Sequence, residues 1–351
     1  MEQNQEKILK TISPTKVILP VLLGLAVAGY MFFTSVDLDT LGAYLAKADL
    51  KWIGIAFLVL FLRDAGYVWR IRYLTNQELS WRSSTYTILL WEFASAVTPS
   101  AVGGTAVAAF IINREGIKFG KSLSYVMLTA LLDNSFFIVA APIAILLSNG
   151  NVFPNIEASA LFGRGLEWTF FISYTLITIY TFFFAFGLFF KPHGFKWLIV
   201  KITSWKFMQR FQHGAEEIGN EVVIASEEMK GKDFRYWANA ILSTIFVWSA
   251  RYFMVNCLLE AFNNDLSFAN HWLVFARHIV MWVIMLISPT PGSSGTAELS
   301  FDLFFGEYIG GFGVAVALLW RLYTYYPYLF LGAFVLPRWL RKVLASSTKP
   351  A

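Results

Sequence analysis

Long apolar runs separated by short polar stretches dominate the pattern along this chain. Six runs are continuous, and each is close to the ~20 residues that an α-helix needs to cross a bilayer. The pattern therefore predicts an all-α polytopic membrane protein with six transmembrane helices. These helices are expected at residues 17–36, 52–68, 122–147, 166–190, 237–262 and 313–335.

The first run contains the small-residue triplet Ala26-Val27-Ala28, which resembles a signal-peptidase site. The apolar pattern continues through this triplet over residues 17–36, which is longer than the apolar part of a signal peptide. We therefore expect an uncleaved first transmembrane helix.

Two further apolar regions, 85–112 and 272–305, are interrupted in the middle. Each flank of the first interruption has roughly eight to fourteen residues, or at most about 21 Å of helix, which is short of the ~30 Å hydrocarbon core. We therefore predict two re-entrant hairpins of half-helices. The interrupting segments read Pro99-Ser100-Ala101-Val102-Gly103-Gly104 and Pro289-Thr290-Pro291-Gly292-Ser293-Ser294-Gly295.

The distribution of basic residues supports the re-entrant arrangement. With both interrupted regions as hairpins, most of the 28 Lys and Arg residues fall on one side of the membrane. If 85–112 crossed the membrane once, the segment 191–236 would carry its eight cations outward, against the positive-inside rule. We therefore predict a multi-pass protein of the cell (cytoplasmic) membrane with both termini in the cytoplasm.

The two interruptions share a short sequence match. Gly104-Thr105-Ala106 is followed by Phe110, and Gly295-Thr296-Ala297 is followed by Phe301 at the same spacing. Both halves of the chain then read span, span, re-entrant hairpin, span, with opposite orientation. This is an inverted-topology repeat, in which a substrate site lies near mid-membrane between discontinuous helices.

The whole chain, 1–351, is predicted to be a single transmembrane domain. Its first repeat half covers 1–150 and its second covers 151–345. The second half includes the long segment 191–236, which mixes Lys and Arg with Trp and Phe and is expected to lie along the cytoplasmic interface. The alternative for this segment is a solvated linker packed on the helix ends.

The turns of the two hairpins are candidate anion sites. The amino end of each second half-helix carries unpaired N–H groups and a partial positive charge. The alternative is that Pro and Gly only form tight turns and the hydroxyls only cap helices. The candidate substrate-binding residues here are Pro99, Ser100, Gly103, Gly104, Thr105, Pro291, Gly292, Ser293, Ser294, Gly295 and Thr296.

Ionisable residues within the apolar segments complete the candidate site, because charges at membrane depth are costly and are usually functional. Arginine suits a phosphate group, which it binds with forked geometry. For each residue the alternative is a structural ion pair, and for Glu298 it is helix capping. We expect Arg251, Arg277, Glu298 and both Gly-Thr turns to share one polar cavity. The ionisable residues assigned to substrate binding, in addition to the turn residues above, are Arg63, Asp133, Arg251, Arg277, Glu298 and Arg321.

Composition excludes several classes of protein. The chain is 57% hydrophobic and only 15% charged, whereas soluble domains average about 25% charged residues. The net charge of +5 comes from basic loops between helices, so no nucleic-acid partner is expected. The single cysteine, Cys257, and four scattered histidines suggest no metal site, and we expect no cofactor.

The second interruption, from Ser288 to Glu298, resembles the lysylphosphatidylglycerol synthase transmembrane (flippase-like) family, whose late motif reads P-x-P-G-G-x-G-x-x-E. Ser293 stands where this motif has its second glycine. The early family element, P-x-x-x-G-G with a following basic loop and an acid in the next helix, resembles Pro99 to Gly104, Arg114 and Asp133. The arginine often found just after those glycines is absent.

The resemblance implies transfer of a polar-headed lipid between leaflets, without the aminoacyl transferase activity of the bifunctional relatives. We therefore expect a flippase or translocase, not an enzyme, with membrane lipid and bilayer as its partners. One alternative is an integral-membrane lipid-modifying enzyme, although no DD or DxxD pair is present. Others are a scaffold whose 191–236 segment docks a lipid-synthesis enzyme, or a transporter of small solutes.

Overall fold

The computed structural model describes residues 46–98, 101–154, 160–205, 208–263, 266–286, 293, 295–310 and 312–347. Within these residues the regular structure is helical, and none of them forms a strand. The predicted all-α class is confirmed. The helix expected at 17–36 lies outside the described residues.

Five helices of the described part are long and apolar enough to cross a membrane. Large apolar side chains on their outer faces, such as Phe61 (63% exposed) and Leu176 (56% exposed), form a surface suited to lipid. Four of the helices coincide with expected spans. The five are α4 (Leu50–Leu74), α7 (Phe119–Leu147), α8 (Ala160–Phe189), α11 (Phe234–Phe262) and α12 (Phe268–Met285).

Short polar residues determine where several of these helices begin. Asp49, Asp233 and Ser267 precede α4, α11 and α12, and each side chain accepts a backbone N–H from the first turn. Such N-caps satisfy donors that have no partner within the helix.

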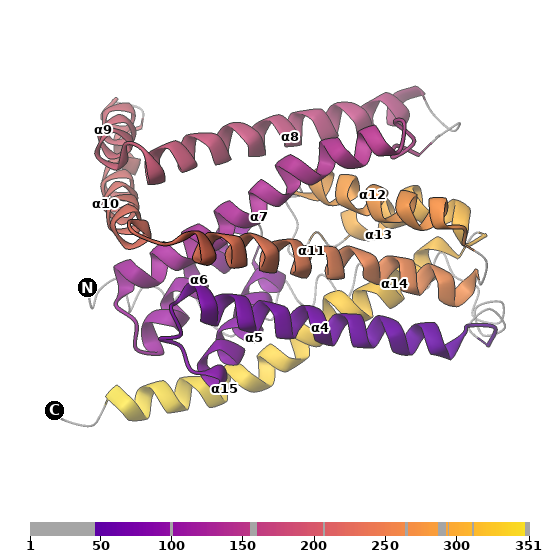
Figure 1. Ribbon diagram of the computed structural model, residues 1–351, viewed down its shortest axis with the longest axis horizontal. Coiled ribbons are helices and arrows are strands. Elements are labelled where there is room, and N and C mark those ends of the chain that lie inside the picture. Colours follow the sequence, from indigo (N-terminus) through magenta and orange to yellow (C-terminus); the bar gives the residue numbers. More distant parts are fainter. Residues whose placement is uncertain are drawn as a thin grey trace.

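The first interrupted region forms a hairpin of α5 (Trp81–Val97) and α6 (Ala101–Arg114), which pack against each other. Both helices lie in one half of the bundle (Figure 1). Gly104, in the first turns of α6, is needed for this packing. A Cβ at Gly104 would overlap Oγ of Ser95 and lie 3.2 Å from its Cα.

The second interrupted region contains α12 and α13 (Thr296–Phe305). These helices lie in the other half of the bundle, and α12 ends near its middle although its length would allow a crossing (Figure 1). Gly295 caps α13 with a φ of +83°, a left-handed conformation that favours glycine. The two hairpins therefore enter the bundle from opposite ends.

The expectation of one continuous helix at 313–335 was wrong. The chain forms α14 (Gly313–Thr324) and α15 (Tyr326–Ser347), with a break at Tyr325. Pro327 accounts for the break, because it has no N–H to donate to the carbonyl of Tyr323 four residues earlier, whereas it is tolerated in the first turn of α15. The hydroxyl of Tyr325 donates to the carbonyl of Ala96 at 3.2 Å and so fixes the break against α5.

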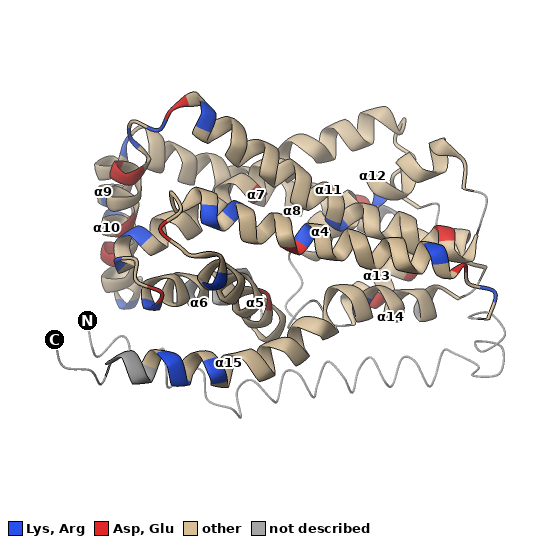
Figure 2. Cartoon of the chain, turned by 60° about the horizontal axis from the view of Figure 1, so that its bottom comes forward, with Lys and Arg blue, Asp and Glu red and all other residues tan. Residues whose placement is uncertain are grey.

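Helices α9 (Pro192–Thr203) and α10 (Gln212–Met229) lie across one end of the bundle (Figure 1). Helix α10 packs against α7, α8 and α9. Many of the Lys and Arg residues gather at this end (Figure 2). Trp197 and Trp205 are 60% and 64% exposed there. This arrangement is compatible with a position of residues 191–236 along the cytoplasmic membrane interface. That position remains a prediction.

Candidate functional site

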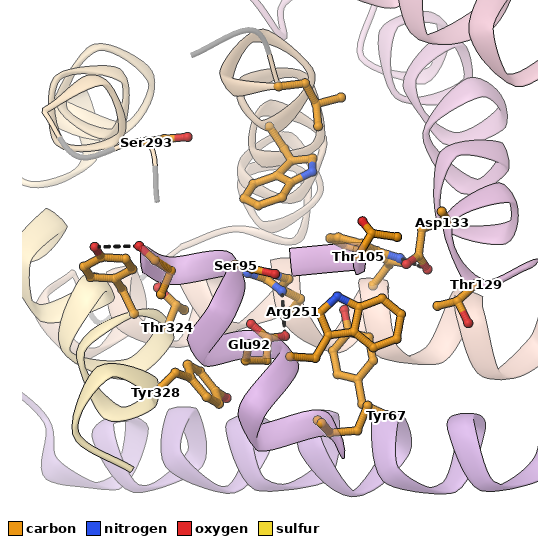
Figure 3. Close-up of a pocket in the computed structure, with 18 of the residues that line it drawn as sticks. Tyr67, Glu92, Ser95, Thr105, Thr129, Asp133, Arg251, Ser293, Thr324 and Tyr328 are labelled. Atoms are coloured by element: carbon orange, nitrogen blue, oxygen red, sulfur yellow. Dashed lines mark hydrogen bonds and ion pairs between the residues drawn. The ribbon is translucent and has the colours of Figure 1, made fainter. Parts of the chain in front are cut away.

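A cavity of about 310 Å³ lies in the middle of the bundle, between the two interrupted regions. Thr98 and Thr105 line it from the first hairpin, and Leu286 and Ser293 line it from the second. Figure 3 shows Thr105 and Ser293 on different sides of this space. We call it the central cavity. Two segments that are far apart in the sequence thus contribute to one site.

Among the described residues, three arginines and two acids line the central cavity. The arginines are Arg70, Arg251 and Arg321, and the acids are Glu92 and Asp133. Aromatic rings supply much of the remaining wall, including those of Trp248 and Trp282. Because such charges are costly within a membrane, each is expected to have a partner of opposite charge.

Asp133 of α7 is held firmly. Its two carboxylate oxygens accept hydrogen bonds from Arg70 of α4 at 2.5 and 3.3 Å. Oδ1 also accepts one from Nε1 of Trp248 at 2.8 Å. Arg70 in addition donates to Oγ1 of Thr244 at 3.2 Å. This cluster joins α4, α7 and α11 along one wall of the cavity.

Arg251 of α11 has a looser partner. Its Nη1 lies 3.5 Å from Oε1 of Glu92 on α5. Its guanidinium carbon lies 5.4 Å from the ring centre of Trp248 and 5.0 Å from that of Trp282. The rings hold the guanidinium by cation–π attraction while its N–H groups remain directed outward in its plane.

Arg63 of α4 is completely buried and stands behind Glu92. Its Nη2 lies 4.0 Å from Oε1 of Glu92 and donates to Oδ1 of Asp64 at 2.7 Å. It also donates to the hydroxyl of Tyr328, a residue that lines the cavity. Arg63 itself is not among the lining residues.

Arg321 of α14 lines the cavity and pairs with Glu298 behind it. Nε of Arg321 donates to Oε1 of Glu298 at 2.8 Å. The other oxygen of Glu298 accepts the N–H of Gly295 at 2.7 Å. Glu298 therefore caps the start of α13, which is the structural alternative considered for it from the sequence. It also forms a buried ion pair with Arg321.

The structure brings some predicted site residues to the cavity and places others elsewhere. Arg277 lies away from it, donating to the carbonyls of Asn151 and Phe304 at 3.3 and 3.1 Å and pairing with Glu307. The expectation that Arg277 and Glu298 share the cavity with Arg251 is therefore wrong, because neither is among the described residues that line it. Gly103 lies in α6, and Thr296 opens α13. Outside the described residues lie Pro99, Ser100, Pro291, Gly292 and Ser294.

Two charged residues of the cavity were not assigned to it from the sequence. Arg70 falls beyond the end of the span expected at 52–68, whereas α4 continues to Leu74 and buries it. The spacing of Arg63, Tyr67 and Arg70, at i, i+4 and i+7, was the available signal, because it puts all three on one helical face. Glu92 is an ionisable residue within the apolar region 85–112, but nothing in the sequence points to its partners.

This arrangement provides what a phosphate group requires. A guanidinium presents several N–H donors in a fork that fits phosphate oxygens. The hydroxyls of Thr105 and Ser293 add short polar groups on the two hairpins. The aromatic rings make part of the wall apolar, and a lower local dielectric strengthens electrostatic attraction inside the cavity.

Comparison with known proteins agrees with the sequence motifs. The family described as the lysylphosphatidylglycerol synthase TM region matches residues 17–332. A UPF0104 membrane protein from Archaeoglobus fulgidus is 24% identical over 327 residues, which cover 89% of this chain and 94% of the relative. The family match extends over most of the chain, including both interrupted hairpins, and it confirms the resemblance seen in the sequence. This multi-pass membrane protein therefore belongs to the lysylphosphatidylglycerol synthase TM region family.

Proposed function

We propose that this protein is a flippase or translocase that moves a polar-headed lipid between the two leaflets. The lipid class is anionic, aminoacylated or polyprenyl-phosphate-linked. The observation that carries the proposal is the central cavity, where Arg251 lies between two interrupted hairpins that enter the bundle from opposite ends. Transfer between leaflets requires a site that each face of the membrane can reach in turn, and such sites lie between discontinuous helices.

The proposed topology has six transmembrane helices and two re-entrant hairpins in an inverted repeat, with halves 1–150 and 151–345. Helices α14 and α15 together form the last crossing, and α12–α13 is the second hairpin. Both termini and the α9–α10 pair face the cytoplasm in this proposal. The gathering of Lys and Arg at the α9–α10 end supports this orientation.

The size of the cavity limits what enters it. Its volume of about 310 Å³ is at the lower end of the roughly 300–1,000 Å³ of small-molecule pockets. It accommodates a head group, whereas the acyl chains remain in the surrounding lipid. The protein would then lower the cost of moving a polar group through hydrocarbon, with Arg251 as the main contact of the phosphate.

Reconstituted liposomes provide the test. Lipids labelled on an acyl chain are offered with phosphatidylglycerol or phosphatidylcholine heads, and a membrane-impermeant reductant quenches the outer leaflet. The wild-type protein is expected to expose inner-leaflet label, and Arg251→Ala to slow this at least tenfold. Arg338→Ala, on the exposed side of α15, is the control. Equal rates in protein-free liposomes would refute the proposal.

The same liposomes test the non-enzymatic part of the proposal. Mass spectrometry of the recovered lipids should show unchanged masses after incubation, with and without divalent metal. Conversion of any lipid would instead favour the alternative of an integral-membrane lipid-modifying enzyme.

A further inference from the structure

The Glu92 carboxylate is held differently from the other acids near the central cavity. Asp133 accepts three hydrogen bonds, and Glu298 accepts two. Among the described residues no hydrogen bond reaches the Glu92 carboxylate, and its contacts are ion pairs at 3.5 Å to Arg251 and 4.0 Å to Arg63. Glu92 lines the cavity and faces Arg251 in Figure 3.

Arg251 likewise has few polar partners among the described residues. A guanidinium has five N–H donors, yet within the described part of the chain Glu92 is the one carboxylate at ion-pair distance. The rings of Trp248 and Trp282 fix the position of the group without using its N–H donors. Arg251 therefore combines a fixed position with donors available to an incoming anion.

Arg63 offers Glu92 a second partner. It is completely buried, and its Nη1 has no hydrogen-bond partner among the described residues. Its Nη2 faces the same Glu92 oxygen that approaches Arg251. A carboxylate that leaves Arg251 therefore remains next to a buried positive charge, which avoids the large cost of an unpaired buried ion.

We infer that Glu92 is an internal counter-ion that occupies Arg251 in the empty cavity and is displaced toward Arg63 when a phosphate group binds. This inference rests on the proposed function and assigns the recognised chemistry to a phosphate ester or phosphate anion. Glu92 competes with the ligand, so it weakens binding and thereby allows release. A ligand without negative charge cannot displace it.

Binding to the purified, detergent-solubilised protein tests the inference by titration calorimetry. The probes are inorganic phosphate, glycerophosphoglycerol, short-chain phosphatidylglycerol and short-chain phosphatidylcholine. Glu92→Gln is expected to bind at least one of the net-negative probes at least tenfold more tightly than the wild type. Glu227→Gln removes one exposed charge on α10 and is expected to leave affinities unchanged.

The probes also distinguish the source of the phosphate. Tighter binding of glycerophosphoglycerol and phosphatidylglycerol, but not of inorganic phosphate, identifies a lipid head group. Tighter binding of inorganic phosphate as well identifies free phosphate as a sufficient ligand. Unchanged or weaker binding of every net-negative probe by Glu92→Gln overturns the inference, since Glu92 would then be a bystander or a ligand contact.

Two provisions keep the test decisive. If Glu92→Gln fails to fold, Glu92→Asp withdraws the carboxylate from Arg251 by one methylene, and a several-fold gain in affinity is expected. Binding in detergent requires no transport. If Glu92→Gln gains affinity but the wild-type protein moves no lipid, the flippase proposal is rejected and the counter-ion role of Glu92 is supported. If the protein moves lipid but Glu92→Gln gains no affinity, the flippase proposal is supported and the counter-ion role is rejected.

Discussion

Arg321 of α14 and Glu298 of α13 form an ion pair with an Nε–Oε1 distance of 2.8 Å, although each side chain is at least 94% removed from solvent. Glu298 also accepts the N–H of Gly295, so the pair connects the start of α13 to a wall of the central cavity. A buried pair of this kind is strongly destabilised when one partner is removed, because the other charge stays buried without compensation.

We expect Arg321→Ala to destabilise the protein by about 3–5 kcal/mol. The double variant Arg321→Gln with Glu298→Gln removes both charges together and should lose clearly less than the sum of the two single Gln variants. Thermal unfolding in detergent, carried out as a double-mutant cycle, measures the difference. Additive losses would show that the two charges do not depend on each other.

Close packing inside the first hairpin gives a second prediction. A methyl group at Gly104 would overlap Oγ of Ser95, and overpacking of this kind costs about 1–3 kcal/mol. Gly104→Ala should therefore lower the melting temperature, and Ser95→Ala should restore part of the loss in the double variant. Gly54→Ala is the control, because no atom of the described residues lies within 4 Å of the added carbon. Equal losses at Gly54 and Gly104 would contradict the packing argument.

Backbone strain at Ser293 gives a third prediction. Ser293 has a φ of +55°, a left-handed conformation that costs a non-glycine residue roughly 1–2 kcal/mol. The family motif has glycine at this position. Ser293→Gly is expected to raise stability by about 0.5–1 kcal/mol, since the greater freedom of glycine in the unfolded chain offsets part of the relief. Ser293→Ala keeps the strain and should not be stabilised, which separates conformation from loss of the hydroxyl.

Much of this fold could be predicted from the sequence, because the length of an apolar run and the presence of helix-breaking residues are local features of the chain. The spans at 52–68 and 237–262 and the interruptions beginning at Pro99 and Pro289 follow from such local patterns. The break at Tyr325 was missed because the apolar run continues through it, and only the position of Pro327 hinted at a change.

The candidate site was harder to predict because its pairs are formed between distant helices. Arg251 and Arg277 look alike in the sequence, as single arginines within apolar helices. Arg251 lies beside Glu92 because α4 packs against both α11 and α5, while Arg277 reaches Glu307 and the carbonyl of Phe304. Local pattern thus identified charged residues at membrane depth without identifying their partners.

Labelling of introduced cysteines tests the proposed orientation. The native Cys257 is buried, so it should contribute little background. Ser267→Cys lies at the exposed start of α12, and His213→Cys replaces an imidazole that is 84% exposed on α10. A membrane-impermeant maleimide should label Ser267→Cys on intact cells and His213→Cys only after permeabilisation. The reverse result would invert the proposed topology, and labelling of both sites on intact cells would reject it.

The α10 helix should make stability depend on pH through Glu221. Burial, reinforced by the nearby Glu217 carboxylate, raises the pKa of Glu221 to about 7, whereas an unfolded Glu titrates near 4.3. Between these values the folded protein holds a proton that the unfolded chain has lost. The free energy of unfolding therefore decreases as pH rises from about 4.3 to 7, and the loss persists above pH 7.

Glu221→Gln removes this titration and is expected to be more stable than the wild type at pH 8, by at most about 1 kcal/mol because water screens a half-buried group. At pH 4.5 the difference should almost disappear. Thermal unfolding of both proteins in the same detergent at the two pH values measures it. Glu216→Gln removes a charge from the exposed side of α10 and is the matched control. An equal gain at both pH values would mean that the substitution acts through packing and not through the proton.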